Sequence, residues 1–165
     1  MPQFSAPPSG RAYLAIPGPS VIPDAVLQAM HRASPNIYAG ELPEMMPGIV
    51  ADLKKVARTS GHVALYIGNG HAAWEAALSN VIAPGDEVLV PATGHFAHGW
   101  ADMAEGLGAT ARIVEFGDRS PVQPEQIADA LKADTSHRIR AVLAVHVDTS
   151  TSVRNDIAAL RRVLD

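Results

Sequence analysis

The residues best suited to chemistry lie where an apolar run meets an alanine-rich segment. Asn69, Gly70 and His71 stand at this junction. The run 63–67 predicts a short strand, and the segment 70–82 predicts a helix. The first N–H groups of a helix have no intrahelical partners, and they lie at the positive end of the helix dipole. We therefore predict that this turn binds a phosphate or another anion.

Two further polar loops are expected beside this turn. Residues 93–96 follow the predicted strand 87–91, and residues 146–150 close the predicted strand 140–147. Alternating strands and helices with apolar strands predict an α/β fold, a parallel sheet covered on both faces. Ligands of such sheets bind at the carboxyl ends of the strands. The other predicted elements are a strand at 110–116 and helices starting at Pro23 and Pro47, spanning 95–107 and 124–133, and starting near Asn155.

Composition narrows the class of protein. The 165 residues predict a single domain, with 47% hydrophobic residues, 18% charged residues and a formal net charge of −4. This balance gives no reason to expect a nucleic acid or an anionic membrane as partner. There are no cysteines, so disulfides and thiolate metal sites are excluded. We expect a cytoplasmic protein without a secretory signal or a transmembrane segment.

A dinucleotide is one candidate ligand. The stretch from Gly68 to Ala73 fits the relaxed G-x-G-x-x-A pattern between a strand and a helix. A Rossmann domain also needs a carboxylate at the tip of its second strand to hold the ribose. Here that strand ends at Ala92, and Asp86 and Glu87 lie at its other end. An NAD-binding domain therefore ranks second.

Pyridoxal 5'-phosphate is the preferred candidate. A phosphate at Asn69, Gly70 and His71 leaves an aromatic ring to be covered and a phenolic oxygen to be matched. Phe96 can stack on the ring. Thr149 or Ser150 can donate a hydrogen bond to the phenolic oxygen.

At these residues the chain resembles the class V aminotransferases, in the alanine–glyoxylate and serine–glyoxylate branch of the fold type I enzymes. The resemblance runs in order over nearly the whole chain. Its motifs are Ile16-Pro-Gly-Pro-Ser20, Gly68-Asn-Gly-His-Ala-Ala-Trp-Glu-Ala-Ala-Leu78, Pro84-Gly-Asp86, Thr93-Gly94 and His146-Val-Asp-Thr-Ser-Thr151.

The resemblance implies a role for each site residue. Asn69, Gly70 and His71 would hold the phosphate, Phe96 would stack on the pyridine, and Thr149 would meet the phenolic oxygen. The implied reaction is transamination between a small amino acid such as serine or alanine and a 2-oxo acid such as glyoxylate. The implied assembly is a homodimer. Residues 1–22 would form an arm, and residues 23–165 would form the amino-terminal part of the large pyridoxal-phosphate-binding domain.

The chain departs from the family at several positions. Asp148 stands where Glu is usual, Ser152 where Gly is usual, and Phe96 where Trp is common. The family's aspartate for the pyridine nitrogen and its Schiff-base lysine lie on later strands, so no catalytic residue is assigned in this chain. The chain's lysines, expected to be exposed, are Lys54, Lys55 and Lys132.

Other interpretations remain open. A chain without the Schiff-base lysine is expected to be inactive alone, and it could be a half-subunit that only binds a partner or cofactor. The glycines could form a tight turn and nothing else, and Phe96 could belong to the core. His71 or residues 149–152 could cap a helix. No metal site is predicted, because the pair His95 and His98 has no third ligand beside it.

Overall fold

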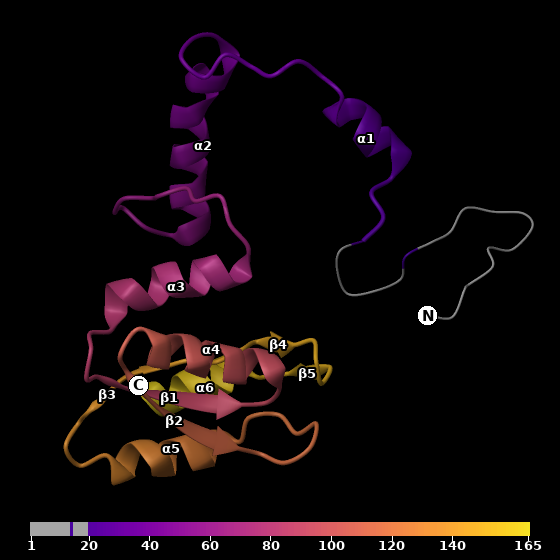
Figure 1. Cartoon of the computed structure of the whole chain (residues 1–165). Helices are drawn as coiled ribbons and strands as arrows, with labels where there is room; N and C mark the ends of the chain where they lie inside the picture. Colours follow the sequence, from indigo (N-terminus) through magenta and orange to yellow (C-terminus); the bar gives the residue numbers. More distant parts are fainter. Residues whose placement is uncertain (1–13, 15–19) are drawn as a thin grey trace, which may run out of the picture. The chain divides into compact units, whose positions relative to one another are not determined.

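The computed structural model describes Leu14 and residues 20–165. By their internal contacts, the residues divide into two units, 1–64 and 65–165. Most of the predicted arm and most of the Ile16–Ser20 motif lie outside the described residues (Figure 1). The domain boundary expected between residues 22 and 23 stays a prediction.

The first unit contains helix α1, Asp24–Met30, and helix α2, Glu41–Ala57. The prediction that α2 opens at Pro47 was wrong, because the helix begins six residues earlier. Gly40 precedes it with a φ of 87°, and Pro43 lies in the first turn, where a backbone N–H would have no helical acceptor. Pro47 lies inside the helix and removes one hydrogen bond without ending it.

The second unit is built on a parallel sheet, as the alternating pattern predicts. Strand β1, Glu87–Ala92, pairs with β2, Thr110–Glu115, on one side and with β3, Ile139–Val142, on the other. A separate antiparallel pair is formed by β4, Val147–Asp148, and β5, Val153–Arg154. Strand β1 is therefore the centre of the sheet, and the segment that follows it emerges at the sheet's carboxyl edge.

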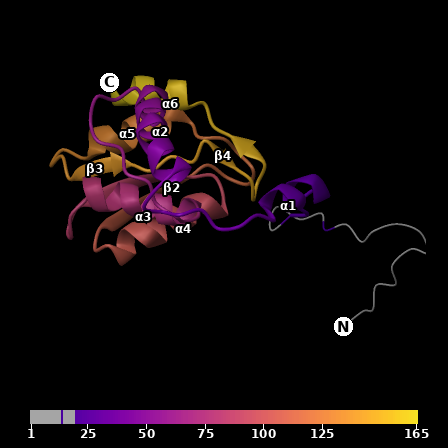
Figure 2. The ribbon, with the colours of Figure 1, turned by 90° about the horizontal axis from the view of Figure 1, so that it is seen from above.

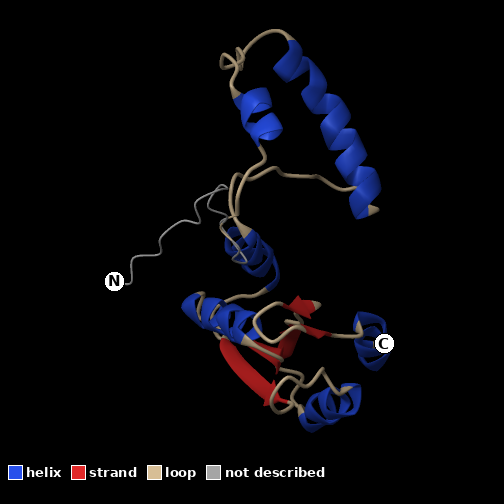
Figure 3. Cartoon of the chain, turned by 90° about the vertical axis from the view of Figure 1, so that its right-hand side faces the viewer, coloured by secondary structure: helices blue, strands red, loops and turns tan. Residues whose placement is uncertain are grey.

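Helices cover both faces of this sheet (Figures 1 and 3). Val88 and Val90 of β1 pack with α4, His95–Gly106, while Leu89 packs on the opposite face with α5, Pro124–Ala133. The predicted helices at 95–107 and 124–133 are thus confirmed within a residue. Helix α6, Ile157–Leu164, packs beside α5 (Figure 2), and α3, Gly70–Val81, contacts α4. Within the described ranges, no helix has the length and apolar character needed to cross a membrane.

The strand predicted at 63–67 was wrong. The chain there is irregular, and Leu65, Tyr66 and Ile67 are exposed. A strand needs a hydrogen-bonding neighbour, and both edges of β1 are already taken by β2 and β3. The strand predicted at 140–147 is also shorter, because β3 ends at Val142. Apolar character identified these segments but could not show whether a partner strand lies beside them.

Candidate functional site

The start of helix α3 has backbone donors that the protein does not use. Asn69 caps the helix: its Oδ1 accepts the N–H of Ala72 at 3.1 Å, and its carbonyl accepts the N–H of Ala73 at 3.2 Å. Among the described residues, no acceptor is recorded for the N–H groups of Gly70 and His71. These two donors lie at the positive end of the helix and are available to an anion.

The two glycines of this turn are needed for different reasons. A Cβ at Gly68 would lie 2.7 Å from the Cβ of Ala72, so the close packing of the turn onto its own helix requires glycine. A Cβ at Gly70 would meet no heavy atom within 4 Å. Gly70 lies in the first turn of the helix and is not among the residues with a positive φ. Neither packing nor backbone conformation in the described residues therefore requires glycine at position 70.

The start of helix α4 is closed by the protein itself. Its N-cap residue, Gly94, has no side chain, and the buried carboxylate of Asp148 takes over the capping role from more than fifty residues away. Oδ2 of Asp148 accepts the N–H of Phe96 at 3.2 Å and that of Ala97 at 3.4 Å. The hydroxyl of Ser150 accepts the N–H of His95 at 2.9 Å. A second anion at α4 would compete with a carboxylate already in place, so α3 is the open helix start of the two.

Asp148 also folds its own loop. Its Oδ1 accepts the backbone N–H of Ser150 at 3.1 Å and the hydroxyl of the same residue. Space for the carboxylate exists only because residue 94 is glycine: a Cβ there would lie 2.5–2.6 Å from the carboxyl atoms of Asp148. The sequence marked Asp148 only as a departure from a family pattern. Asp148, Ser150 and Gly94 together form a polar clamp at the start of α4. The sequence signal for this clamp is a carboxylate followed by Thr and Ser after a strand, together with a glycine before a helix.

An aromatic group links the two helix starts. The ring of His71 lies 5.0 Å from that of Trp74 and 6.3 Å from that of Phe96, measured between centroids. Trp74 stacks on Trp100 at 5.2 Å with an angle of 19° between the ring planes. Phe96 is half-buried and packs against the core. Both expectations for Phe96 are compatible with this position, since one part of the ring contacts the core and another faces His71.

A buried amide fastens the end of β1 to the later loops. Asn155 donates to the carbonyl of Val145 at 2.7 Å and to the hydroxyl of Thr93 at 3.1 Å. Its Oδ1 accepts the N–H of Val122 at 2.9 Å. The hydroxyl of Thr151 donates to the carbonyl of Thr93 at 2.7 Å. The carboxyl edge of the sheet is therefore held by polar side chains.

The predicted site residues lie in one region of the second unit, at the sheet's carboxyl edge. His71 is beside Phe96, and Phe96 is bonded to the loop in which Thr149 is exposed. Within the part of the chain that the structure describes, no contact joins Thr149 to Asn69 or Gly70. The roles assigned to these residues toward a cofactor stay predictions.

The remaining titratable candidates lie elsewhere. His98 pairs with Glu115 of β2 at 3.2 Å rather than with His95. Lys55 is exposed and pairs with Asp52 at 2.8 Å. Lys54 is half-buried, so its expected exposure was wrong: it lines a hollow on α2 together with Val50 and Ala51.

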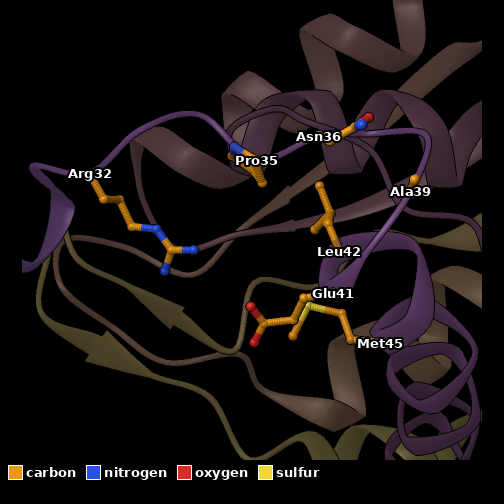
Figure 4. Close-up of a pocket in the computed structure, with 7 residues that line it drawn as sticks. All are labelled: Arg32, Pro35, Asn36, Ala39, Glu41, Leu42 and Met45. Atoms are coloured by element: carbon orange, nitrogen blue, oxygen red, sulfur yellow. The ribbon is translucent and has the colours of Figure 1, made fainter.

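A separate cavity of about 260 Å³ lies within the first unit. The guanidinium of Arg32 and the carboxylate of Glu41 point toward one space, and Leu42 and Met45 also line the cavity (Figure 4). Arg32 and Glu41 are exposed. The cavity therefore has no buried polar group to select a ligand, and the open donors of α3 remain the better site.

Comparison with known families gives a match over nearly the whole chain. The family model described as "Aminotransferase class-V" matches residues 12–164. The chain is 40% identical over 157 residues to a serine–glyoxylate aminotransferase of Methylorubrum extorquens, and 35% identical over 157 residues to that of Arabidopsis thaliana. Each alignment covers 94% of this chain and 39% of the relative.

Solved structures show the same likeness. An alanine–glyoxylate aminotransferase from Nostoc sp. superposes with a TM-score of 0.73 at 29% identity, covering 97% of this chain and 44% of that one. A pyridoxamine–pyruvate aminotransferase from Mesorhizobium loti gives a TM-score of 0.74 at 26% identity, covering 89% and 37%. The chain thus spans about 39% of the length of the curated relatives it matches.

Proposed function

The chain belongs to the class-V aminotransferase family, whose members depend on pyridoxal 5'-phosphate, and from this we propose that it contributes the phosphate- and ring-binding face of a transaminase. The observation that carries the proposal is the contrast between two neighbouring helix starts. At the start of α4, Asp148 and Ser150 accept the first backbone N–H groups. At the start of α3, the N–H groups of Gly70 and His71 have no acceptor among the described residues, and Gly70 adds no side chain over them.

The donor set fits the cofactor's phosphate and ring. The N–H groups of Gly70 and His71 would hold the phosphate, and Nδ2 of Asn69 would donate to it while its Oδ1 caps the helix. Phe96 would support the pyridine ring, and the exposed Thr149 would donate its hydroxyl to the phenolic oxygen. When bound, pyridoxal phosphate supplies an aldehyde that accepts and returns amino groups and a ring that takes up electrons. The chain's own residues supply binding and orientation.

The substrates follow from the relatives. We propose a small amino acid, serine or alanine, as amino donor and a 2-oxo acid such as glyoxylate as acceptor, because the similar proteins carry the names serine–glyoxylate and alanine–glyoxylate aminotransferase. We also propose that the protein forms a homodimer and is cytoplasmic, as expected from the sequence.

The second unit does not place a lysine at this site. Helix α5 ends at Ala133, just after Lys132, and the chain then enters β3 at its amino end. Because β1 and β3 are parallel, Lys132 lies at the edge of the sheet opposite the start of α4. We therefore infer that residues 65–165 bind the cofactor without a covalent bond to it, which supports a second function for the chain, namely binding without catalysis.

Titration of the 165-residue chain with pyridoxal phosphate and with NAD separates the cofactor classes. We expect saturable binding of pyridoxal phosphate and none of NAD. Saturable binding of NAD alone would favour the Rossmann alternative and contradict the proposal.

Borohydride reduction of the chain with one equivalent of pyridoxal phosphate, followed by peptide mapping, tests the covalent step. We expect no single lysine to be labelled stoichiometrically and no glyoxylate-dependent turnover of serine or alanine. Stoichiometric labelling of Lys54, Lys55 or Lys132 together with turnover would show that the chain carries its own catalytic lysine.

A further inference from the structure

The polar clamp at the start of α4 connects the two segments that the proposed function assigns to the ring of the cofactor. Phe96 is the second residue of α4, and Thr149 lies between Asp148 and Ser150. Oδ2 of Asp148 fixes the backbone of Phe96, while its Oδ1 fixes the backbone of Ser150. A single side chain thus determines where both residues stand.

The environment of this carboxylate makes its position well defined. Asp148 is fully buried, and the four groups that meet its oxygens are all N–H or O–H donors. Its negative charge lies at the positive end of helix α4. The hydroxyl of Ser150 extends the clamp by one bond, since it donates to Asp148 and accepts the N–H of His95. The absent side chain of Gly94 provides the room.

We propose that Asp148 is a positioning residue of the cofactor site: its buried carboxylate, accommodated by Gly94 and extended by Ser150, holds Phe96 and Thr149 in fixed relation to each other. This inference rests on the proposed cofactor function. In this arrangement the phosphate and the ring of the cofactor are held by separate parts of the protein. The phosphate is held at the start of α3, which the clamp does not contact, and the ring is held by the two segments that the clamp joins.

Because phosphate and ring would be held in separate places, a positioning role of Asp148 can be distinguished from a general role in stability. The ring probe is 4'-deoxypyridoxine 5'-phosphate, which has no aldehyde and cannot react with surface lysines. The phosphate probe is inorganic phosphate, followed by the NMR shifts of the Gly70 and His71 amides. Asp148→Asn removes the charge and turns one acceptor into a donor that faces N–H groups. We expect its affinity for the ring probe to fall at least tenfold, while its affinity for inorganic phosphate stays within twofold.

Two further variants and a control keep the test independent of Asp148→Asn. Gly94→Ala places a Cβ against the carboxylate, and Ser150→Ala removes the acceptor for His95. Both should weaken the ring probe, Gly94→Ala by about as much as Asp148→Asn and Ser150→Ala by three- to fivefold, again with phosphate unchanged. Asp129→Asn makes the same chemical change on an exposed position of α5 and should change neither affinity.

The outcomes separate this inference from the proposed function. If the unmodified chain binds neither probe, the proposed cofactor function is wrong. If it binds both and the clamp variants bind the ring probe as tightly as it does, Asp148 does not position the site. If ring and phosphate affinities fall together in Ser150→Ala, the clamp only maintains the fold, and the inference is overturned. Should Asp148→Asn fail to fold, the Ser150→Ala result decides by itself.

Discussion

At Gly70 the packing of the protein and the proposed binding of a phosphate place different demands on the same residue. A Cβ at this position would find open space in the protein, but it would stand over the N–H groups proposed to meet a phosphate. We expect Gly70→Ala to leave the free energy of unfolding nearly unchanged and to weaken pyridoxal phosphate binding about tenfold or more. A cofactor titration and urea unfolding of the same variant measure both effects.

Two comparisons sharpen this prediction. Gly99→Ala in α4 also adds a Cβ that meets nothing within 4 Å, and it should leave cofactor affinity unchanged. His71→Ala removes one side chain but keeps the backbone donor, so it should weaken binding less than Gly70→Ala does. Equal affinities for the Gly70 and His71 variants would mean that the loop is a turn and nothing else.

Asn155 is the residue whose loss should cost the most folding free energy at the sheet's carboxyl edge. Asn155→Leu leaves the N–H of Val122 and the carbonyl of Val145 without their partners in a buried site. We expect the free energy of unfolding, measured with urea, to fall by about 2–4 kcal/mol. Asn80→Ala removes an exposed amide bonded only within α3 and should cost less than about 1 kcal/mol. Similar losses for both variants would contradict this role of Asn155.

Asp134 gives the protein a predictable response to acid. The backbone N–H of Ile139, 2.8 Å away, lowers the pKa of this carboxyl below its ordinary value of 3.8. A lowered pKa in the folded state stabilises the fold above about pH 4, and this contribution is lost as the pH falls through the folded-state pKa. We expect Asp134→Asn to reduce the acid dependence of the free energy of unfolding between about pH 5 and pH 3. Asp129→Asn, which removes no hydrogen bond to the backbone, is the control.

At the scale of elements, helix α3 is attached to the sheet domain through an aromatic contact with α4 and through Leu78 in the core. Trp74 stacks on Trp100, and Leu78 is the one fully buried residue among the described positions of α3. Trp74→Ala should therefore lower the free energy of unfolding by about 1–3 kcal/mol and speed hydrogen exchange of the α3 amides.

The matched variant is Trp74→Phe, which keeps an aromatic ring against Trp100 and should retain most of the protection. Faster exchange in α5 but not in α3 would show that Trp74 stabilises a different element. Since α3 carries the open N–H donors, its attachment to α4 also determines how these donors face Phe96.

At the scale of the whole molecule, apolar surface predicts self-association. Several large apolar side chains are exposed in both units. Tyr66 and Ile67 are two exposed neighbours in the sequence, and Ile67 is fully exposed. Light scattering at micromolar concentration should detect a dimer or a larger species. Ile67→Lys should weaken this association, whereas Val81→Lys, at the end of α3, should not. A monodisperse monomer of the unmodified chain would contradict the prediction.

Local pattern was sufficient for most elements of the second unit. The helices at 95–107 and 124–133 and the strand at 87–91 were predicted within a residue, because their apolar faces repeat with the helical or strand period and glycine or proline marks their ends. The start of helix α3 was predicted for a similar reason, since an Asn cap between two glycines is a local feature.

Pairing and capping over long distances could not be predicted in this way. The run 63–67 has the apolar character of a strand, yet whether a strand forms depends on a neighbour that no local pattern identifies. In the sequence, Gly94 indicates a helix start without a side-chain cap. The cap is supplied by Asp148, which is more than fifty residues later in the chain.

The sequence by itself therefore determined the family, the parallel sheet and the capped start of helix α3, because these follow from the order and periodicity of residues. Only the tertiary structure decided which of two helix starts is open and which is closed. It decided this because the folding of the later strands buries the Asp148 carboxylate against α4, while α3 keeps the N–H groups of Gly70 and His71 without a partner from the described chain.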